Sequence, residues 1–341
     1  MNLSEAPMIF FTVVAQMCIG AFVALGIIQI FGRTKYSQRT IDRVTDPAVY
    51  AIGPAMVIGL IASMFHMHDV FHVFNVFRHW QSSWLTREII FGILFAGFGF
   101  VFALMQWMRW GSGVLRQVVA SLAALSGVGL LWSMSAIYAS LRAVPAWHSW
   151  AVPFQFTMVA ILLGCLLVCV ALVVVNVVRK HRQDALEGVA TKVEAAEEAG
   201  QGSGGVVTLV KKRVGLIHAP CSGDEWKLTS TSIQGLTFAA SLASAAMLVS
   251  YPLYIAQLAG GDQTAQASAQ VFSGGLFLAC LILFAVAGIM LSFVSFWLAR
   301  KKSLGARNLL AWVVSIAFVT ALVASFISRM FHYEAMLRVG I

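Results

Sequence analysis

The stretch PFQFTMVAILLGCLLVCVALVVVNVV, residues 153–178, contains no charged side chain. About 20 apolar residues in a helix cross the hydrocarbon core of a bilayer, which is roughly 30 Å thick, so this stretch predicts a membrane-spanning helix. The whole chain has the same character, because it is 60% hydrophobic and only 11% charged. Soluble domains are about 25% charged. The composition therefore predicts a polytopic, all-α membrane protein that is embedded in the lipid bilayer.

Seven further apolar runs predict a bundle of eight transmembrane helices. The expected spans are residues 7–31, 48–67, 87–108, 115–139, 153–178, 233–258, 271–299 and 308–330. They divide the chain into residues 1–178 with spans one to five, a polar insert at 179–232, and residues 233–341 with spans six to eight. The first run follows no basic segment or small-residue cleavage site, so we expect it to be retained.

Basic residues predict the orientation of the spans. Most of the 23 lysines and arginines lie in alternate connections, including the 179–232 insert. Basic connections stay in the cytoplasm, so we expect both termini on the outer side of a cytoplasmic (inner) membrane. The formal net charge of +9 then reflects membrane topology, and we expect no nucleic-acid partner.

Cysteine spacing excludes the usual metal and cluster motifs. The chain has five cysteines and no Cys-x-x-Cys pair; they are Cys18, Cys165, Cys169, Cys221 and Cys280. We interpret those within spans as small packing residues. The chain is therefore expected to carry no metal site and no iron–sulfur cluster of its own.

Residues 65–90, FHMHDVFHVFNVFRHWQSSWLTREII, gather titratable side chains between spans two and three. Half of the eight histidines lie there: His66, His68, His72 and His79. Aromatic and polar residues alternate at helical spacing, which indicates an amphipathic helix at the membrane surface. Interfacial packing is the favoured interpretation for His68, His72 and His79.

His66 and Glu88 differ from their neighbours because they lie where spans two and three meet the surface. Ionisable side chains at the edge of the apolar layer are costly and are often functional. The structural alternative for Glu88 is a first-turn carboxylate that stabilises the helix dipole, near an N-cap at Ser82 or Ser83.

Quinol oxidation needs such a pair of side chains. A quinol loses two protons with its two electrons, and its head group sits at the interface while its tail lies in lipid. Partial burial shifts a carboxyl group toward a pKa at which it is a competent base, and a histidine titrates near neutrality. Glu88 is the candidate proton acceptor and His66 the candidate ligand for a quinol oxygen, while Arg87 and Arg78 are candidates for quinol binding or partner docking.

Two other functions use polar groups in membranes. A b-type cytochrome needs histidines that face each other within a bundle, and His66 with His332 is the one pair that the sequence offers. A secondary transporter has interrupted spans, and Pro54 and Pro252 interrupt spans two and six. The sequence leaves both alternatives open.

Four stretches together resemble the membrane-anchor subunit of dimethyl sulfoxide reductases, the DmsC-like family. They are IASMFHMH with SSWLTREIIFG, EAPMIFFTVVAQMCIGAF, YASLRAVPAWHSWAVPFQF and SRMFHYEAMLRVG. The likeness covers nearly the whole chain except the polar insert. This chain departs from the family pattern at His68, where a glycine is common, and at Ser325, where a glutamate is common.

The resemblance implies eight helices with both termini outside, and a chain that is not the terminal catalytic subunit. It implies menaquinol as the bound substrate, no haem, and two partners: an iron–sulfur electron-transfer subunit and a molybdopterin catalytic subunit. Anaerobic respiration is the expected process. The family's quinol-site histidine and glutamate fall on His66 and Glu88.

Overall fold

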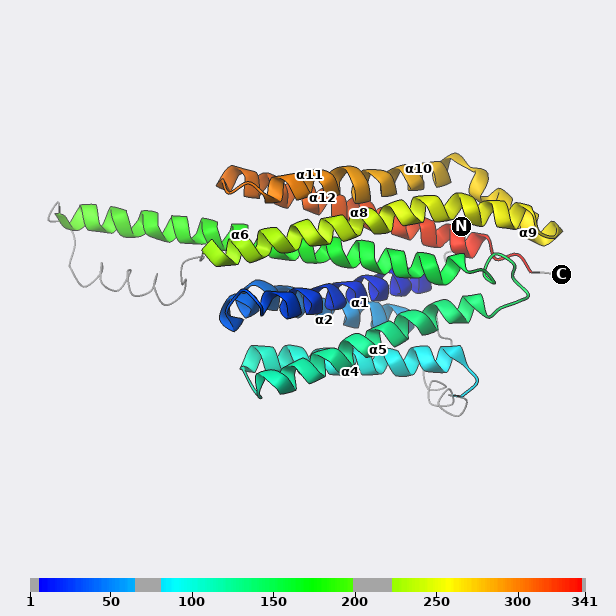
Figure 1. Cartoon of the computed structure of the whole chain (residues 1–341), viewed down its shortest axis with the longest axis horizontal. Coiled ribbons are helices and arrows are strands. Elements are labelled where there is room, and N and C mark those ends of the chain that lie inside the picture. Colours follow the sequence, from blue (N-terminus) through cyan, green and yellow to red (C-terminus); the bar gives the residue numbers. More distant parts are fainter. Residues whose placement is uncertain (1–5, 65–80, 199–222, 339–341) are drawn as a thin grey trace.

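A computed structural model of the chain describes residues 6–64, 81–198 and 223–338. These residues are almost entirely helical and contain no β-strand (Figure 1). Eight of the helical segments are long and apolar enough to cross a membrane. The predicted all-α bundle of eight spans is confirmed.

Twelve helical segments occur in the described residues. Their bounds are α1 (Ala6–Gly32), α2 (Gln38–Met64), α4 (Trp84–Met108), α5 (Gly113–Ala139), α6 (Ala151–Glu198), α8 (Gly223–Ala259), α9 (Gln263–Gln270), η4 (Val271–Ser273), α10 (Gly275–Phe284), η5 (Ala285–Leu291), α11 (Ser292–Ala299) and α12 (Leu304–Glu334).

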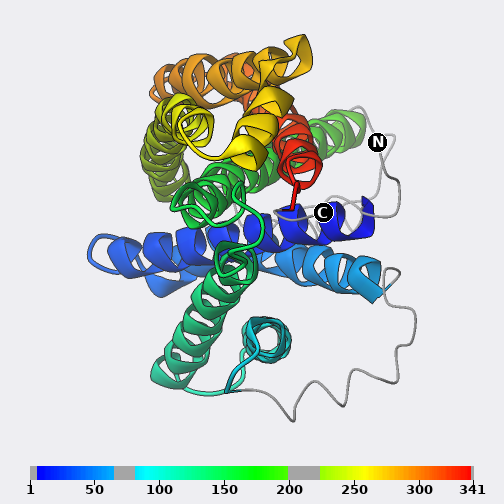
Figure 2. The same cartoon turned by 90° about the vertical axis from the view of Figure 1, so that its right-hand side faces the viewer.

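The long helices lie side by side along the length of the molecule, and α1 begins at the same end as α12 finishes (Figure 1). Helices α4 and α5 pack on each other along one side, and α10 and α11 lie on the opposite side (Figure 2). Helices α1 and α6 pack together between these two sides.

Two glycines bring α1 and α6 into backbone contact. A Cβ atom added to Gly20 would lie 1.8 Å from the Ala160 carbonyl oxygen, and one added to Gly164 would lie 2.2 Å from the Gly20 carbonyl carbon. Small residues let membrane helices approach this closely, and the resulting van der Waals contact drives their association. The buried side chains of Cys18, Cys165 and Cys169 pack in the same core, as predicted.

Helix α2 begins at Gln38, ten residues before the predicted start of span two, because ion pairs stabilise its polar first turns. Asp42 and Asp46 are buried, and the Arg109 guanidinium binds their carboxylates with N–O distances of 2.7 and 2.9 Å. Arg109 ends α4 with a φ of 53°. This left-handed conformation costs a non-glycine residue about 1–2 kcal/mol, which the two ion pairs offset.

Two other boundaries differ from the sequence prediction. Helix α6 continues past residue 178 to Glu198, and α8 begins at Gly223, so the described ends of the 179–232 insert are extensions of spans five and six. Residues 199–222 lie outside the described residues.

Span seven contains the π-helical segment η5, next to which the Ser244 hydroxyl donates a 2.8 Å hydrogen bond to the Phe284 carbonyl.

The α1–α6 contact predicts opposite effects for two glycine substitutions. Gly164→Ala places a methyl group against backbone and should lower stability by about 1–3 kcal/mol or more. Gly97→Ala in α4 meets no atom within 4 Å and should be neutral or slightly stabilising. Thermal unfolding in detergent measures both variants. Equal melting temperatures would contradict the proposed contact.

Candidate functional site

Glu88 lies just inside α4. The helix is capped by Ser83, whose hydroxyl accepts a hydrogen bond of 3.3 Å from the Thr86 amide, so the predicted serine N-cap is confirmed at Ser83. The first turn of α4 contains no acidic residue, and Glu88 lies beyond it. The interpretation of Glu88 as a first-turn dipole partner is therefore wrong.

The Glu88 carboxylate is buried without a partner among the described residues. The residue is 6% exposed, and its side chain makes no hydrogen bond or ion pair with them. A buried carboxylate in this state is costly, and such groups in membrane helices mark functional sites more often than structural ones.

Arg87 lies next to Glu88 in sequence, but its side chain contacts Trp84 and Gln81. Its guanidinium lies over the Trp84 ring at 4.3 Å from the ring centroid and donates a hydrogen bond to the Gln81 carbonyl. Successive helical residues point about 100° apart. These contacts hold Arg87 at the start of α4. The structure therefore does not bring the Arg87 and Glu88 side chains together.

The other predicted site residues, His66 and Arg78, lie outside the described residues, as do His68, His72 and His79. The pairing of His66 with Glu88 therefore stays a prediction.

Two tyrosines connect Glu88 to the opposite side of the bundle. The hydroxyls of Tyr138 in α5 and Tyr333 in α12 lie 2.6 Å apart and share a hydrogen bond. Tyr138 interacts electrostatically with both Glu88 and Arg329. We call Glu88, Tyr138, Arg329, His332 and Tyr333 the Tyr138 cluster.

His332 is held by aromatic rings. Its ring stacks on Trp147 with centroids 5.4 Å apart and meets Tyr138 edge-on at 4.8 Å. The Trp147 indole N–H also donates a 2.8 Å hydrogen bond to the His332 carbonyl oxygen. Trp147 belongs to the connection between α5 and α6, so these contacts fix that connection against the end of α12.

Arg329 supplies a buried positive charge. It is 5% exposed, lies 3.7 Å from the centroid of the Phe156 ring, and donates a 3.3 Å hydrogen bond to the Gln16 side chain. A cavity of about 10 Å³ beside it is lined partly by Gln155 and His332, a size that suits about one water molecule. Side-chain nitrogens of Gln155, Arg329 and His332 are buried there without a hydrogen-bond partner in the described residues.

Comparison with known proteins identifies the family of this chain. A sequence model described as the DMSO reductase anchor subunit (DmsC) matches residues 1–335. The chain belongs to the DmsC family. It is thus a multi-pass membrane anchor subunit of a DMSO reductase-like complex, as the resemblance implied.

Three relatives resemble this DmsC-family protein over part of its length. An anaerobic dimethyl sulfoxide reductase chain from Escherichia coli (strain K12) is 30% identical over 48% of this protein and 56% of the relative. A Haemophilus influenzae chain of the same name is 28% identical over 53% and 63%, respectively. A sulfite dehydrogenase subunit from Allochromatium vinosum is 24% identical over 41% and 46%. The matches thus span about half the length of these relatives.

Sequence reasoning did not select several polar groups that the DmsC fold brings together. Gln16, Gln155 and Arg329 are amide or ionisable side chains within or beside apolar runs, which is the signal that could have identified them as site residues. His332 was considered only as a possible haem ligand. No group of three or more His, Cys, Asp or Glu side chains suited to a metal ion occurs in the described parts of the chain.

The tyrosine pair gives a stability prediction for this DmsC-family protein. Tyr333→Phe leaves the buried Tyr138 hydroxyl without its hydrogen bond and should cost about 1–3 kcal/mol. Tyr138→Phe combined with Tyr333→Phe should cost less than the sum of the single changes, because the variants share one interaction. Thermal unfolding in detergent measures this cycle. Strictly additive effects would show that the two hydroxyls are not coupled.

Proposed function

We propose that this chain binds and oxidises menaquinol at the end of the bundle that holds Glu88. Electrons then pass to a partner iron–sulfur subunit and on to a molybdopterin catalytic subunit. The observation that carries the proposal is the buried Glu88 carboxylate, which has no hydrogen-bond or ion-pair partner among the described residues and interacts electrostatically with Tyr138. A proton acceptor in an apolar wall near a membrane surface is what quinol oxidation requires.

The chemistry divides between two residues. Oxidation of one quinol releases two protons and two electrons. Glu88 accepts one proton, and His66 binds a quinol oxygen and relays the second proton. The two electrons leave to the partner subunit, so the quinol becomes the quinone and the protein is ready for the next molecule once Glu88 has released its proton to water.

The remaining cluster residues orient the ring and stabilise charge. The Tyr138 hydroxyl can exchange its hydrogen bond with Tyr333 for one to a quinol oxygen, and the Arg329 guanidinium favours negative charge on nearby oxygens. Such interactions are stronger in a water-poor site than at the surface.

The basic connections lie at the opposite end from Glu88, so we place the Glu88 end on the outer face of the inner membrane. Helix α4 begins where α1 begins and α12 ends (Figure 1), and both termini then share that face. Protons from the quinol would be released on the outer side.

The direction of electron flow depends on the catalytic partner. The Allochromatium vinosum relative is named a sulfite dehydrogenase subunit. In a complex whose catalytic subunit oxidises its substrate, electrons would flow toward the membrane, and the anchor would reduce quinone at the same site. The likeness to two dimethyl sulfoxide reductase chains favours quinol oxidation in this protein.

Glu88→Gln tests the assignment in the assembled complex. The amide cannot accept a proton, so quinol-dependent reduction of the partner cluster should fall by about 10²–10⁴-fold. The complex should still assemble, because the amide has nearly the same shape. Stopped-flow absorbance with a menaquinol analogue measures the rate, and co-purification of the partners measures assembly.

Glu334→Gln is the matched control. Glu334 is exposed at the same end of the bundle, at the last residue of α12, and its change should leave the rate intact. An assembled Glu88→Gln complex that reduces the cluster at the wild-type rate would refute Glu88 as the proton acceptor.

A further inference from the structure

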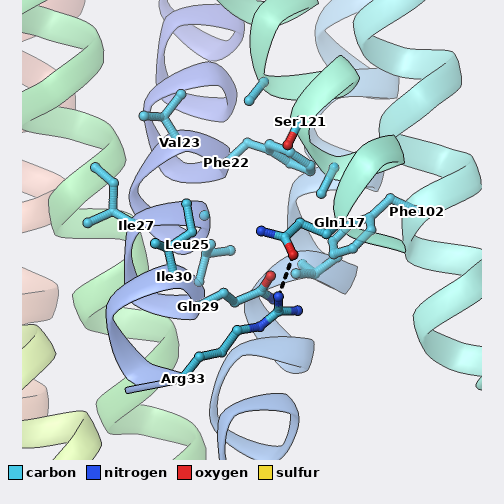
Figure 3. Close-up of a pocket in the computed structure, with 14 residues that line it drawn as sticks. Phe22, Val23, Leu25, Ile27, Gln29, Ile30, Arg33, Phe102, Gln117 and Ser121 are labelled. Atoms are coloured by element: carbon cyan, nitrogen blue, oxygen red, sulfur yellow. Dashed lines mark hydrogen bonds between the residues drawn. The ribbon is translucent and has the colours of Figure 1, made fainter. Parts of the chain in front are cut away.

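A separate crevice lies nearer the other end of the bundle. It has a volume of about 200 Å³ and is lined by residues of α1, α2, α4 and α5 (Figure 3). Phe102 of α4 is on its wall, 14 residues after Glu88, which corresponds to about 21 Å along the helix. The crevice is therefore distinct from the Tyr138 cluster.

The lining of the crevice is apolar at one end and polar at the other. Phe22, Val23 and Ile27 line its length, whereas Gln29, Arg33 and Gln117 gather at its lower end in Figure 3. Ile27 is 49% exposed, so the crevice opens on the lipid-facing side of α1. This division matches an amphiphile with a long apolar chain and one polar head.

Charge at the polar end identifies the head group. The Arg33 guanidinium donates a hydrogen bond to the Gln117 side-chain oxygen, which is neutral. The carboxylates of Asp42 and Asp46, in the following helix α2, are bound to Arg109. Arg33 pairs with no carboxylate of the described residues.

Two more basic residues follow Arg33 within six positions of the sequence. Lys35 follows it in the connection from α1 to α2, and Arg39 lies in the first turn of α2, both exposed. Neither forms an ion pair with a described carboxylate. This corner of the bundle therefore carries surplus positive charge next to an apolar crevice, a combination that binds anionic lipid head groups.

We propose that the crevice is a binding site for an anionic phospholipid. One acyl chain lies along Phe22, Val23 and Ile27, and the phosphate binds the Arg33 guanidinium. Arginine suits this role because its planar donors match phosphate oxygens. A quinone head is neutral and would gain little from the positive charge.

The test is native mass spectrometry of the intact, partner-bound complex after delipidation. The probes are phosphatidylglycerol, phosphatidylcholine and a menaquinone, each added at matched concentration. Wild-type complex should retain phosphatidylglycerol about tenfold more tightly than phosphatidylcholine, since loss of one charge-assisted contact corresponds to roughly that ratio.

Three variants separate charge from shape. Arg33→Gln should abolish the preference for phosphatidylglycerol. Gly26→Phe should weaken retention of both phospholipids, because Gly26 lines the crevice and has open space around its Cα atom. Lys302→Gln removes one exposed charge in the connection before α12 and should leave the preference unchanged.

Several results would overturn the proposal. They are equal retention of the two phospholipids by wild type, an unchanged preference in Arg33→Gln, or a Gly26→Phe complex that loses menaquinone but keeps phosphatidylglycerol. None of these readouts uses quinol oxidation, so the proposal stands or falls separately from the role of Glu88.

Discussion

The backbone contact between α1 and α6 at Gly20 and Gly164 positions the rest of the bundle. No side chain larger than hydrogen fits at the crossing, so the two helices have one close arrangement. One turn before Gly20 is Gln16, and two turns before Gly164 is Phe156; both contact Arg329 of α12. The crossing thus places on α1 and α6 the two groups that hold the buried guanidinium. Through Arg329 and Tyr333, α12 then meets Tyr138 of α5.

Buried carboxylates are ion-paired at one end of the bundle but not, among the described residues, at the other. Asp42 and Asp46 form ion pairs with Arg109, and Arg116 lies 3.9 Å from the Asp42 carboxylate, so two arginines face two carboxylates and the group joins α2 to α4. Glu88, at the other end of α4, has no such partner in the described structure. An ion-paired carboxylate serves the fold, because its charge is already compensated. A buried carboxylate without such a partner costs stability, and its presence favours chemistry in which the group gains and loses a proton.

Local sequence patterns predicted the spans and the serine N-cap of α4, because each depends on hydrophobicity or on neighbours within one turn. They also selected Glu88, which the structure buries and whose role as a site residue stays a prediction. The early start of α2 depends on Arg109, more than 60 residues away, and the π-helical segment η5 lies against Ser244 of another helix. The Tyr138 cluster joins residues from α4, α5 and α12, and no local pattern marks them as neighbours. His66 and Arg78 were also selected from the sequence, and they lie outside the described residues.

The most direct test of quinol oxidation at Glu88 is the position of the quinone ring in an electron cryomicroscopy structure of the assembled complex incubated with menaquinone. We predict ring density within hydrogen-bonding distance of Glu88, with its second oxygen toward His66 and its isoprenoid tail leaving between helices into lipid. Ring density confined to the crevice at Arg33, with none near Glu88, would contradict the assignment.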